Sequence, residues 1–135
     1  MELSQILAII IIHFIADFIF QDERWANGKS KNNTSLVTHT IVYSIVFTFL
    51  LFGFQLIYEY DSNIMLLMEK VVHFGMITFV FHTITDYFTS RVVSKKFVNK
   101  EYGSSVPNFG AFTIIGFDQV LHYVQMFITY IVIFM

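Results

Sequence analysis

The chain has 135 residues, of which 56% are hydrophobic, 19% are aromatic and only 13% are charged. A soluble domain of this size has about 25% charged residues and cannot keep so much Phe, Ile and Val from water, so the composition indicates an integral membrane protein. The formal net charge of -2 offers no basic face for nucleic acid, and the lack of cysteine excludes disulfides, thiolate metal sites and cysteine nucleophiles.

Four apolar stretches are each long enough to cross a bilayer as an α-helix, which takes about 20 residues. They cover residues 3–21, 36–58, 64–90 and 112–134. Their hydrophobic runs are continuous rather than alternating, which disfavours a β-barrel. We therefore predict an all-α integral membrane protein: a bundle of four transmembrane helices that forms one membrane-embedded helical domain over residues 1–135.

The first stretch carries a stripe of polar side chains. His13, Asp17 and Gln21 follow one another at four-residue spacing, and residues four apart lie on one face of a helix. Because Asp17 interrupts the apolar run, we expect a retained helix rather than a cleaved signal peptide. The polar connection 22–35 follows, and Lys29 is one of its basic residues.

The second stretch, 36–58, contains no Asp, Glu, Lys or Arg and has one histidine, His39, near its start. A predicted turn at 61–63 leads into the third stretch, where His82 and Asp86 again lie four residues apart. Charged residues within membrane helices almost always face the bundle interior or a water-filled cavity. The repeated spacing therefore predicts a second polar stripe that faces the inside of the bundle.

The fourth stretch carries a third pair, in the reverse order. The connection 91–110 begins with Arg91 and leads into this stretch. Asp118 and His122 are also four residues apart, and Gln119 lies beside them. Three pairs of one chemical type, each within an apolar stretch, predict a shared site between the helices.

The basic residues predict the orientation in the membrane. Connections 22–35 and 91–110 hold seven of the eight Lys and Arg residues. By the positive-inside rule, both connections are cytoplasmic and both termini lie outside. All three pairs then fall in one layer, so we expect the polar His/Asp cluster in the cytoplasmic half of the bilayer.

Imidazole and carboxylate groups are ligands for divalent metals such as Zn, Mn or Fe, so the cluster predicts a site for one or two such ions. Its candidate ligands are His13, Asp17, His39, His82, Asp86, Asp118 and His122. Either Asp17 or Asp118 is the candidate catalytic general base. The candidates for substrate binding are Gln21, Gln119, Lys29 and Arg91, of which the two cations would contact a phosphate.

These residues predict a metal-dependent hydrolase acting on a lipid-linked or phosphate-bearing substrate at the cytoplasmic side. The lipid bilayer is a predicted partner, and so is a second copy of the chain in a homodimer that seals the cavity. The alternative is a transporter or channel for metal ions or protons, although polar residues are scarce in the outer half. A third class is a non-enzymatic membrane regulator that binds a host membrane protein. Buried pairs that only join helices would explain the pattern without any ligand.

In this combination, the polar motifs resemble a family of small bacterial and phage integral membrane proteins catalogued as domain of unknown function 3307. The resemblance spans nearly the whole chain. It implies a small multi-helix protein of the bacterial inner (plasma) membrane and implies no particular chemistry. The residues that carry it are His13, Asp17, Gln21, Trp25, Lys29, His39, His82, Asp86, Arg91, Asp118, Gln119 and His122.

Overall fold

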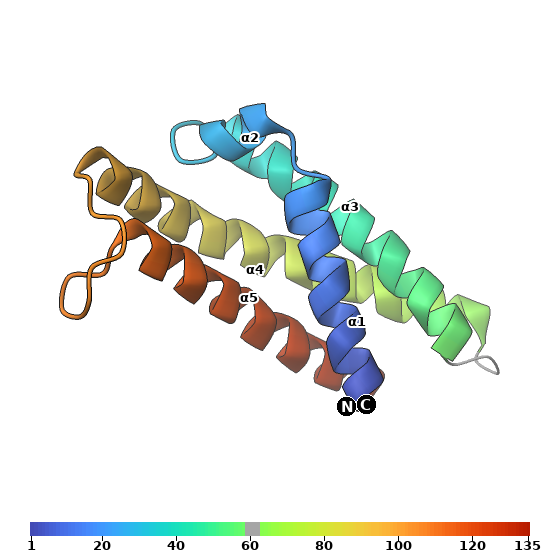
Figure 1. The fold of residues 1–135 in the computed structure, drawn as a ribbon. Coiled ribbons are helices and arrows are strands. Elements are labelled where there is room, and N and C mark those ends of the chain that lie inside the picture. The colour runs from blue at the N-terminus through green and yellow to red at the C-terminus, as the bar shows by residue number, and fades with distance from the viewer. Residues whose placement is uncertain (59–62) are drawn as a thin grey trace.

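The computed structural model describes residues 1–58 and 63–135, and within these residues it consists of helices and connections with no strand. In chain order the helices are α1 (Leu3–Phe14), the π-helical turn η1 (Ile15–Ile19), α2 (Glu23–Gly28), α3 (Asn33–Tyr58), α4 (Ile64–Val98) and α5 (Ala111–Phe134), as Figure 1 shows. The all-α prediction is confirmed. The turn expected at 61–63 lies outside the described residues except for Asn63, whose side chain caps the start of α4.

Three of the described helices, α3, α4 and α5, are long and apolar enough to cross a membrane, with 26, 35 and 24 residues. The first predicted stretch gives a shorter apolar helix, Leu3–Ile19, made of α1 and η1. This helix ends before Gln21 because a new helix begins directly after it. The side chain of Asp22 accepts a hydrogen bond from the backbone N–H of Arg24 and caps the start of α2.

Asp17 lies in the π-helical turn at the end of the first stretch. The backbone N–H of Phe20 donates to the carbonyl of Ile15 at 3.1 Å, which spans one residue more than the hydrogen bond of an α-helix. Such turns accommodate an extra residue and are frequent at functional sites. Here the turn packs on α3 and buries Asp17, while Phe18 and Ile19 stay exposed.

α4 continues past Ser90, where the apolar stretch ends, as far as Val98. The helix continues because residues 91–97 contain no Gly or Pro, and backbone hydrogen bonds rather than hydropathy maintain a helix. It ends in a Schellman motif with Lys100 in the left-handed region at φ 59. Arg91 therefore lies on a helix rather than in a loop.

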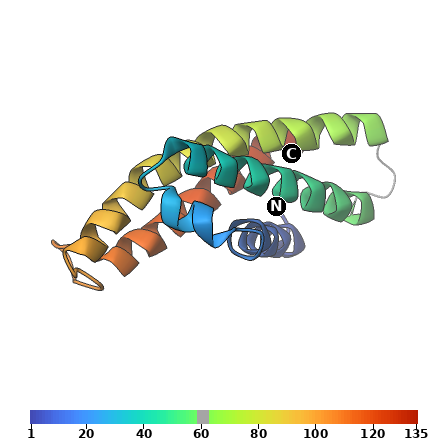
Figure 2. The ribbon, with the colours of Figure 1, turned by 90° about the horizontal axis from the view of Figure 1, so that it is seen from above.

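The long helices pack side by side, with α4 between α3 and α5. α1 packs on α3 and also contacts α5, and α2 packs on α3. Figure 2 shows α1 nearly end-on, so it crosses the long helices rather than running parallel to them. In Figure 1, α2 and the α4–α5 connection lie at one end of the bundle and both termini lie at the other. The two basic connections therefore share one end of the molecule.

The bundle interior divides into an apolar half and a polar half. In the apolar half, Phe47 of α3 and Phe74 of α4 stack with ring centroids 5.4 Å apart, and Met126 of α5 is fully buried in the same core. Gly75 lets α4 approach α3 closely, because a Cβ atom there would clash with the hydroxyl of Thr48. The ionisable groups gather in the other half, towards α2.

Candidate metal centre

Seven ionisable side chains meet inside the polar half of the bundle. They come from α1, η1, α3, α4 and α5, and each residue is at most 8% exposed. They are His13, Asp17, His39, His82, Asp86, Asp118 and His122. The structure thus brings together all the candidate ligands of the sequence, although they are spread over most of the chain.

Three of these residues, Asp17, His39 and His82, present one atom each to a common point, and a fourth lies beside them. Asp17 Oδ1, His39 Nε2 and His82 Nε2 form a triangle with sides of 3.1, 3.4 and 3.6 Å. Asp86 Oδ2 lies 3.2 Å from His39 Nε2 and 3.7 Å from His82 Nε2, and so adds a fourth corner. We call these four residues the four-donor group.

Five of the six donor–donor distances in the four-donor group suit a tetrahedral divalent ion. Donors at about 2.0–2.2 Å from such an ion lie about 3.3–3.6 Å from one another, and the five distances scatter around this range. Hydrogen bonding explains the arrangement less well. Asp17 Oδ1 has no hydrogen-bond partner among the described residues, because His39 Nε2 is near it but poorly aligned for a bond. Donor atoms that face a shared point rather than one another are arranged as the ligands of a metal ion are.

A second set of donors lies on the other side of Asp86. Asp86 Oδ1 is 3.4 Å from His122 Nε2, which is 3.5 Å from Asp118 Oδ1. The rings of His82 and His122 stack, with centroids 4.0 Å apart and an angle of 18° between their planes. His122 Nε2 has no hydrogen-bond partner in the part of the chain that the structure describes. We call Asp86, Asp118 and His122 the three-donor group.

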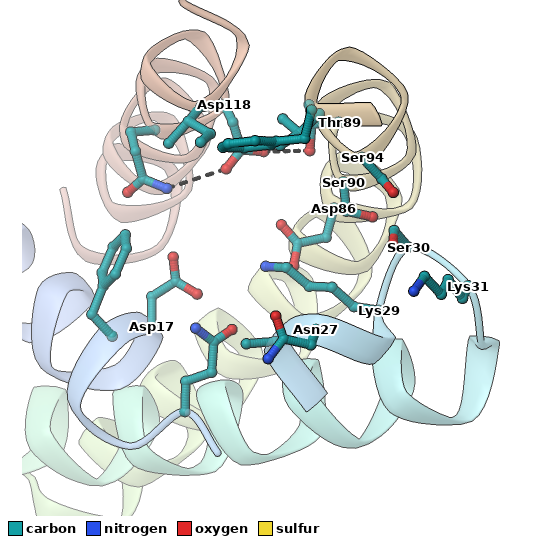
Figure 3. A pocket seen from close by; sticks show the side chains of 17 residues that line it. Asp17, Asn27, Lys29, Ser30, Lys31, Asp86, Thr89, Ser90, Ser94 and Asp118 are labelled. Carbon is teal, nitrogen blue, oxygen red and sulfur yellow. Dashed lines mark hydrogen bonds and ion pairs between the residues drawn. The ribbon is translucent and has the colours of Figure 1, made fainter. Parts of the chain in front are cut away.

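Lys29 reaches the cluster from outside the long helices. It follows α2 directly, and its Nζ donates to Asp86 Oδ2 at 2.8 Å; Figure 3 shows the two side chains together. Burial alone would lower the pKa of the Lys29 ammonium, but the carboxylates of Asp86 and Asp17 outweigh burial and raise that pKa above its ordinary value. Lys29 therefore stays charged and offsets part of the negative charge of the carboxylates.

His13 joins the cluster through hydrogen bonds of its own. Its Nδ1 is 2.9 Å from the hydroxyl of Tyr43, and its Nε2 is 3.0 Å from Gln119 Oε1. An amide oxygen only accepts, so Nε2 carries the proton and Nδ1 accepts from Tyr43. Gln119 Nε2 donates to Asp118 Oδ2 at 3.1 Å, and the Thr89 hydroxyl donates to Asp118 Oδ1 at 2.6 Å. His13 thus helps to orient the Asp118 carboxylate.

A pocket of about 580 Å³ lies beside the cluster, at the end of the bundle that carries α2 (Figure 3). The three carboxylates Asp17, Asp86 and Asp118 form part of its wall. The remaining polar wall consists of Gln21, Asn27, Lys29, Ser30, Lys31, Thr89, Ser90, Ser94 and Gln119. The apolar wall consists of Phe18, Ala26, Val93, Phe97 and Ile115. The pocket can therefore take a molecule with one polar and one apolar part.

Two polar atoms in the pocket wall are free to bind a ligand. Gln21 Oε1 and Ser90 Oγ are buried and have no hydrogen-bond partner among the residues described. A buried polar group without a partner is costly and calls for an explanation. Both residues line the pocket, so a ligand bound there would satisfy them.

Two residues of the sequence pattern lie away from the pocket. Arg91 was a candidate for substrate binding, but its Nη2 donates to Asn33 Oδ1 at 2.8 Å and its guanidinium lies over the ring of Tyr87. Because α4 continues through this position, the side chain stays on the outer surface of the helix. His73, the fifth histidine, is exposed, and its Nδ1 lies 2.8 Å from the carbonyl of Glu69.

The sequence also contained signals for residues that we did not select. Tyr43 follows His39 by four residues and Thr89 follows Asp86 by three, so each lies on the same helical face as a candidate ligand. Ser90 follows Asp86 by four residues in the same way. Extending the four-residue rule from ionisable to hydroxyl side chains would have found Tyr43 and Ser90, and the three-residue spacing of the same helical face would have found Thr89.

The fold and the cluster define a class: a small all-helical protein with three membrane-length helices and a buried histidine–aspartate cluster that could hold a metal ion. The chain belongs to the family described as Protein of unknown function (DUF3307), whose family model matches residues 6–135. The resemblance seen in the sequence is thereby confirmed. No curated protein and no solved structure matches the chain.

Proposed function

We propose that the protein is a membrane-embedded, metal-dependent hydrolase of a lipid-linked or phosphate-bearing substrate. The observation that carries this proposal is the four-donor group, in which imidazole nitrogen and carboxylate oxygen atoms lie 3.1–3.7 Å apart, buried beside a pocket with Lys29 in its wall. A divalent ion held there by Asp17, His39, His82 and Asp86 would supply Lewis-acid charge and lower the pKa of water to about 7.

The same proposal places the chain in a bacterial inner membrane as four transmembrane helices. The fourth span is α1 with η1, whose 12 and 5 residues would extend over about 25 Å. That length is slightly less than the roughly 30 Å of a hydrocarbon core. With α2 and the α4–α5 connection in the cytoplasm, the short helix would end below the inner surface and leave the pocket open to that side.

The reaction that fits the pocket is hydrolysis of a phosphate ester. A water oxygen adds to phosphorus, the bond from phosphorus to the alcohol oxygen breaks, and a carboxylate takes one proton from the water. The protonated carboxyl group then gives this proton to the leaving alcohol oxygen, and inorganic phosphate is the second product. Asp118 is the better placed base, because Thr89 and Gln119 orient both of its oxygens; Asp17 is the other candidate. Lys29 and Lys31 would contact the phosphate.

The packing of the apolar half favours an enzyme over a transporter. Phe47, Leu51, Phe74 and Met126 are all fully buried and form one core between the cluster and the end that holds the termini. Gln55, Thr78 and Tyr130 are buried polar side chains, but they are uncharged and each takes part in a hydrogen bond. A path for protons or metal ions would need ionisable or hydrated groups through this core. An enzyme needs only the single opening beside α2.

Phosphate release from purified protein tests the proposal. Protein in mild detergent would be stripped with a chelator, reloaded with Mn²⁺ or Zn²⁺, and given phosphatidic acid in mixed micelles or p-nitrophenyl phosphate in solution. We expect ion-dependent release that Asp118→Asn lowers at least about 100-fold, within the range of a lost general base. His73→Gln, a change at the histidine outside the cluster, should leave the rate unchanged. Equal rates with and without ions would contradict a metal-dependent hydrolase. Equal rates in Asp118→Asn and His73→Gln would contradict it as well.

A further inference from the structure

We propose that the cluster is a dinuclear centre in which Asp86 bridges two divalent ions, one closed and one open to the pocket. This inference rests on the proposed function in one respect, namely that the cluster binds metal. It adds a second metal position, assigns its donors, and requires a bound anion at that position. In this arrangement Asp118 is a metal ligand rather than the general base.

The two oxygens of Asp86 face different histidines. Oδ2 lies near His39 Nε2 and His82 Nε2, at 3.2 and 3.7 Å, whereas Oδ1 lies 3.4 Å from His122 Nε2. One ion at the four-donor group would leave His122 Nε2 without a partner, although it is buried and points at carboxylate oxygens. A carboxylate that bridges two ions uses both oxygens, and such ions lie roughly 3.5–4 Å apart.

The two positions differ in how many donors the protein supplies. The four-donor group provides four donors, the number that a closed site uses, whereas three protein ligands leave a position for water or substrate. In the three-donor group, Asp86 and Asp118 both line the pocket, so the vacant position would face it. The hydrogen bonds of Asp118 to Thr89 and Gln119 fix its orientation in the way that outer partners of metal ligands do.

The charge of the cluster explains why an anion belongs to the second position. Asp17, Asp86 and Asp118 contribute three negative charges and Lys29 one positive charge, and metal-bound histidines are neutral. One divalent ion would therefore neutralise the cluster, and a second would leave a charge of about +2 in a buried site, which is costly unless it is paired. A phosphate dianion in the pocket would restore neutrality. Binding of the second ion and of phosphate should then reinforce each other.

Manganese loading tests this inference without any enzymatic assay. Full-length protein in detergent would be dialysed against Mn²⁺ with inorganic phosphate, its metal content measured by mass spectrometry, and its electron paramagnetic resonance spectrum recorded. We expect two Mn²⁺ per chain and the multiline signal of an exchange-coupled pair. Omitting phosphate should weaken the second ion about tenfold, within the usual range of coupling between sites.

Variants assign the two positions. His122→Phe keeps a ring against His82 and should retain one ion with an uncoupled spectrum. Asp118→Asn should also lose the second ion, and it changes the shape of the side chain less. Asp86→Asn should abolish the coupled signal and keep at most one ion, held by Asp17, His39 and His82, and His73→Phe should keep both ions. Circular dichroism and gel filtration show which variants fold.

The possible results separate the two proposals. One uncoupled Mn²⁺ per chain in the wild type would overturn the dinuclear centre and leave the single-ion hydrolase standing. No bound Mn²⁺ would overturn both. A coupled pair in a protein that hydrolyses none of the tested esters would support the centre and count against the hydrolase.

Discussion

The contact between Lys29 and Asp86 gives the sharpest prediction, because it places a fixed positive charge where an ion is proposed to bind. Lys29 Nζ lies 2.8 Å from Asp86 Oδ2, and the two side chains are 20% and 2% exposed. The same oxygen belongs to the four-donor group. A divalent ion and the ammonium must therefore compete for it, and Lys29→Met, which removes the charge and keeps an unbranched side chain, should tighten ion binding.

The magnitude follows from the geometry of the pair. At 2.8 Å, an effective dielectric of about 20 gives an attraction of about 6 kcal/mol. Much of this is lost to desolvation, so the net value is that of a hydrogen bond between charged groups, about 1.5–3 kcal/mol. An ion that no longer has to displace the ammonium should bind roughly 10- to 150-fold more tightly. Without an ion, the variant should be less stable by a similar energy, because Asp86 loses its counter-charge.

Calorimetric titration of Mn²⁺ into chelator-treated protein measures the affinity, and thermal unfolding with and without Mn²⁺ measures the stability. Lys31→Met is the matched control, since Lys31 lines the same pocket and the substitution makes the same chemical change to the side chain. It should alter Mn²⁺ affinity by less than about threefold, as a screened surface charge would. Weaker ion binding in Lys29→Met, or equal effects of the two substitutions, would refute competition at Asp86.

Three further outcomes follow from the structure. Tyr43→Phe should lower stability in detergent by about 1–2 kcal/mol, because it leaves His13 Nδ1 buried without its donor; an unchanged unfolding midpoint would contradict the hydrogen-bond assignment. Gly75→Ala should cost about 1–3 kcal/mol through overpacking against Thr48, and the double variant with Thr48→Ala should recover most of that loss, a recovery that denaturant unfolding measures. Saturating Zn²⁺ should raise the unfolding temperature of wild-type protein, and a chelator should reverse the rise, because an ion that binds only the folded state stabilises it. Asp86→Asn should show a smaller rise, and a rise equal to wild type would count against the proposed ligands.

Hydropathy predicted the long helices well but placed their ends poorly. Continuous apolar runs of this length predict membrane-crossing helices, and α3, α4 and α5 lie where the sequence indicated. Helix ends depend on local hydrogen bonds that hydropathy does not report. α4 therefore runs on to Val98, beyond the apolar stretch, and the first helix ends at Ile19 after a π-turn.

The spacing of ionisable residues predicted which side chains meet, because residues four apart share a helical face and a charged group in lipid must face inwards. It could not predict how they pair. His39 contacts Asp17 and Asp86 from other helices, which depends on how the helices cross. The contact of Lys29 with Asp86 depends on where the short helix α2 folds back, and the sequence pattern does not specify that.

X-ray absorption at the zinc edge tests the metal centre most directly, because it reports the atoms around the ion itself. For purified protein reloaded with Zn²⁺, we expect nitrogen and oxygen neighbours at about 2.0–2.2 Å together with the outer-shell scattering of imidazole rings. His39→Phe should weaken the imidazole scattering. Zinc that is lost on washing, or zinc surrounded by water oxygens alone, would contradict the assignment of these buried residues as ligands.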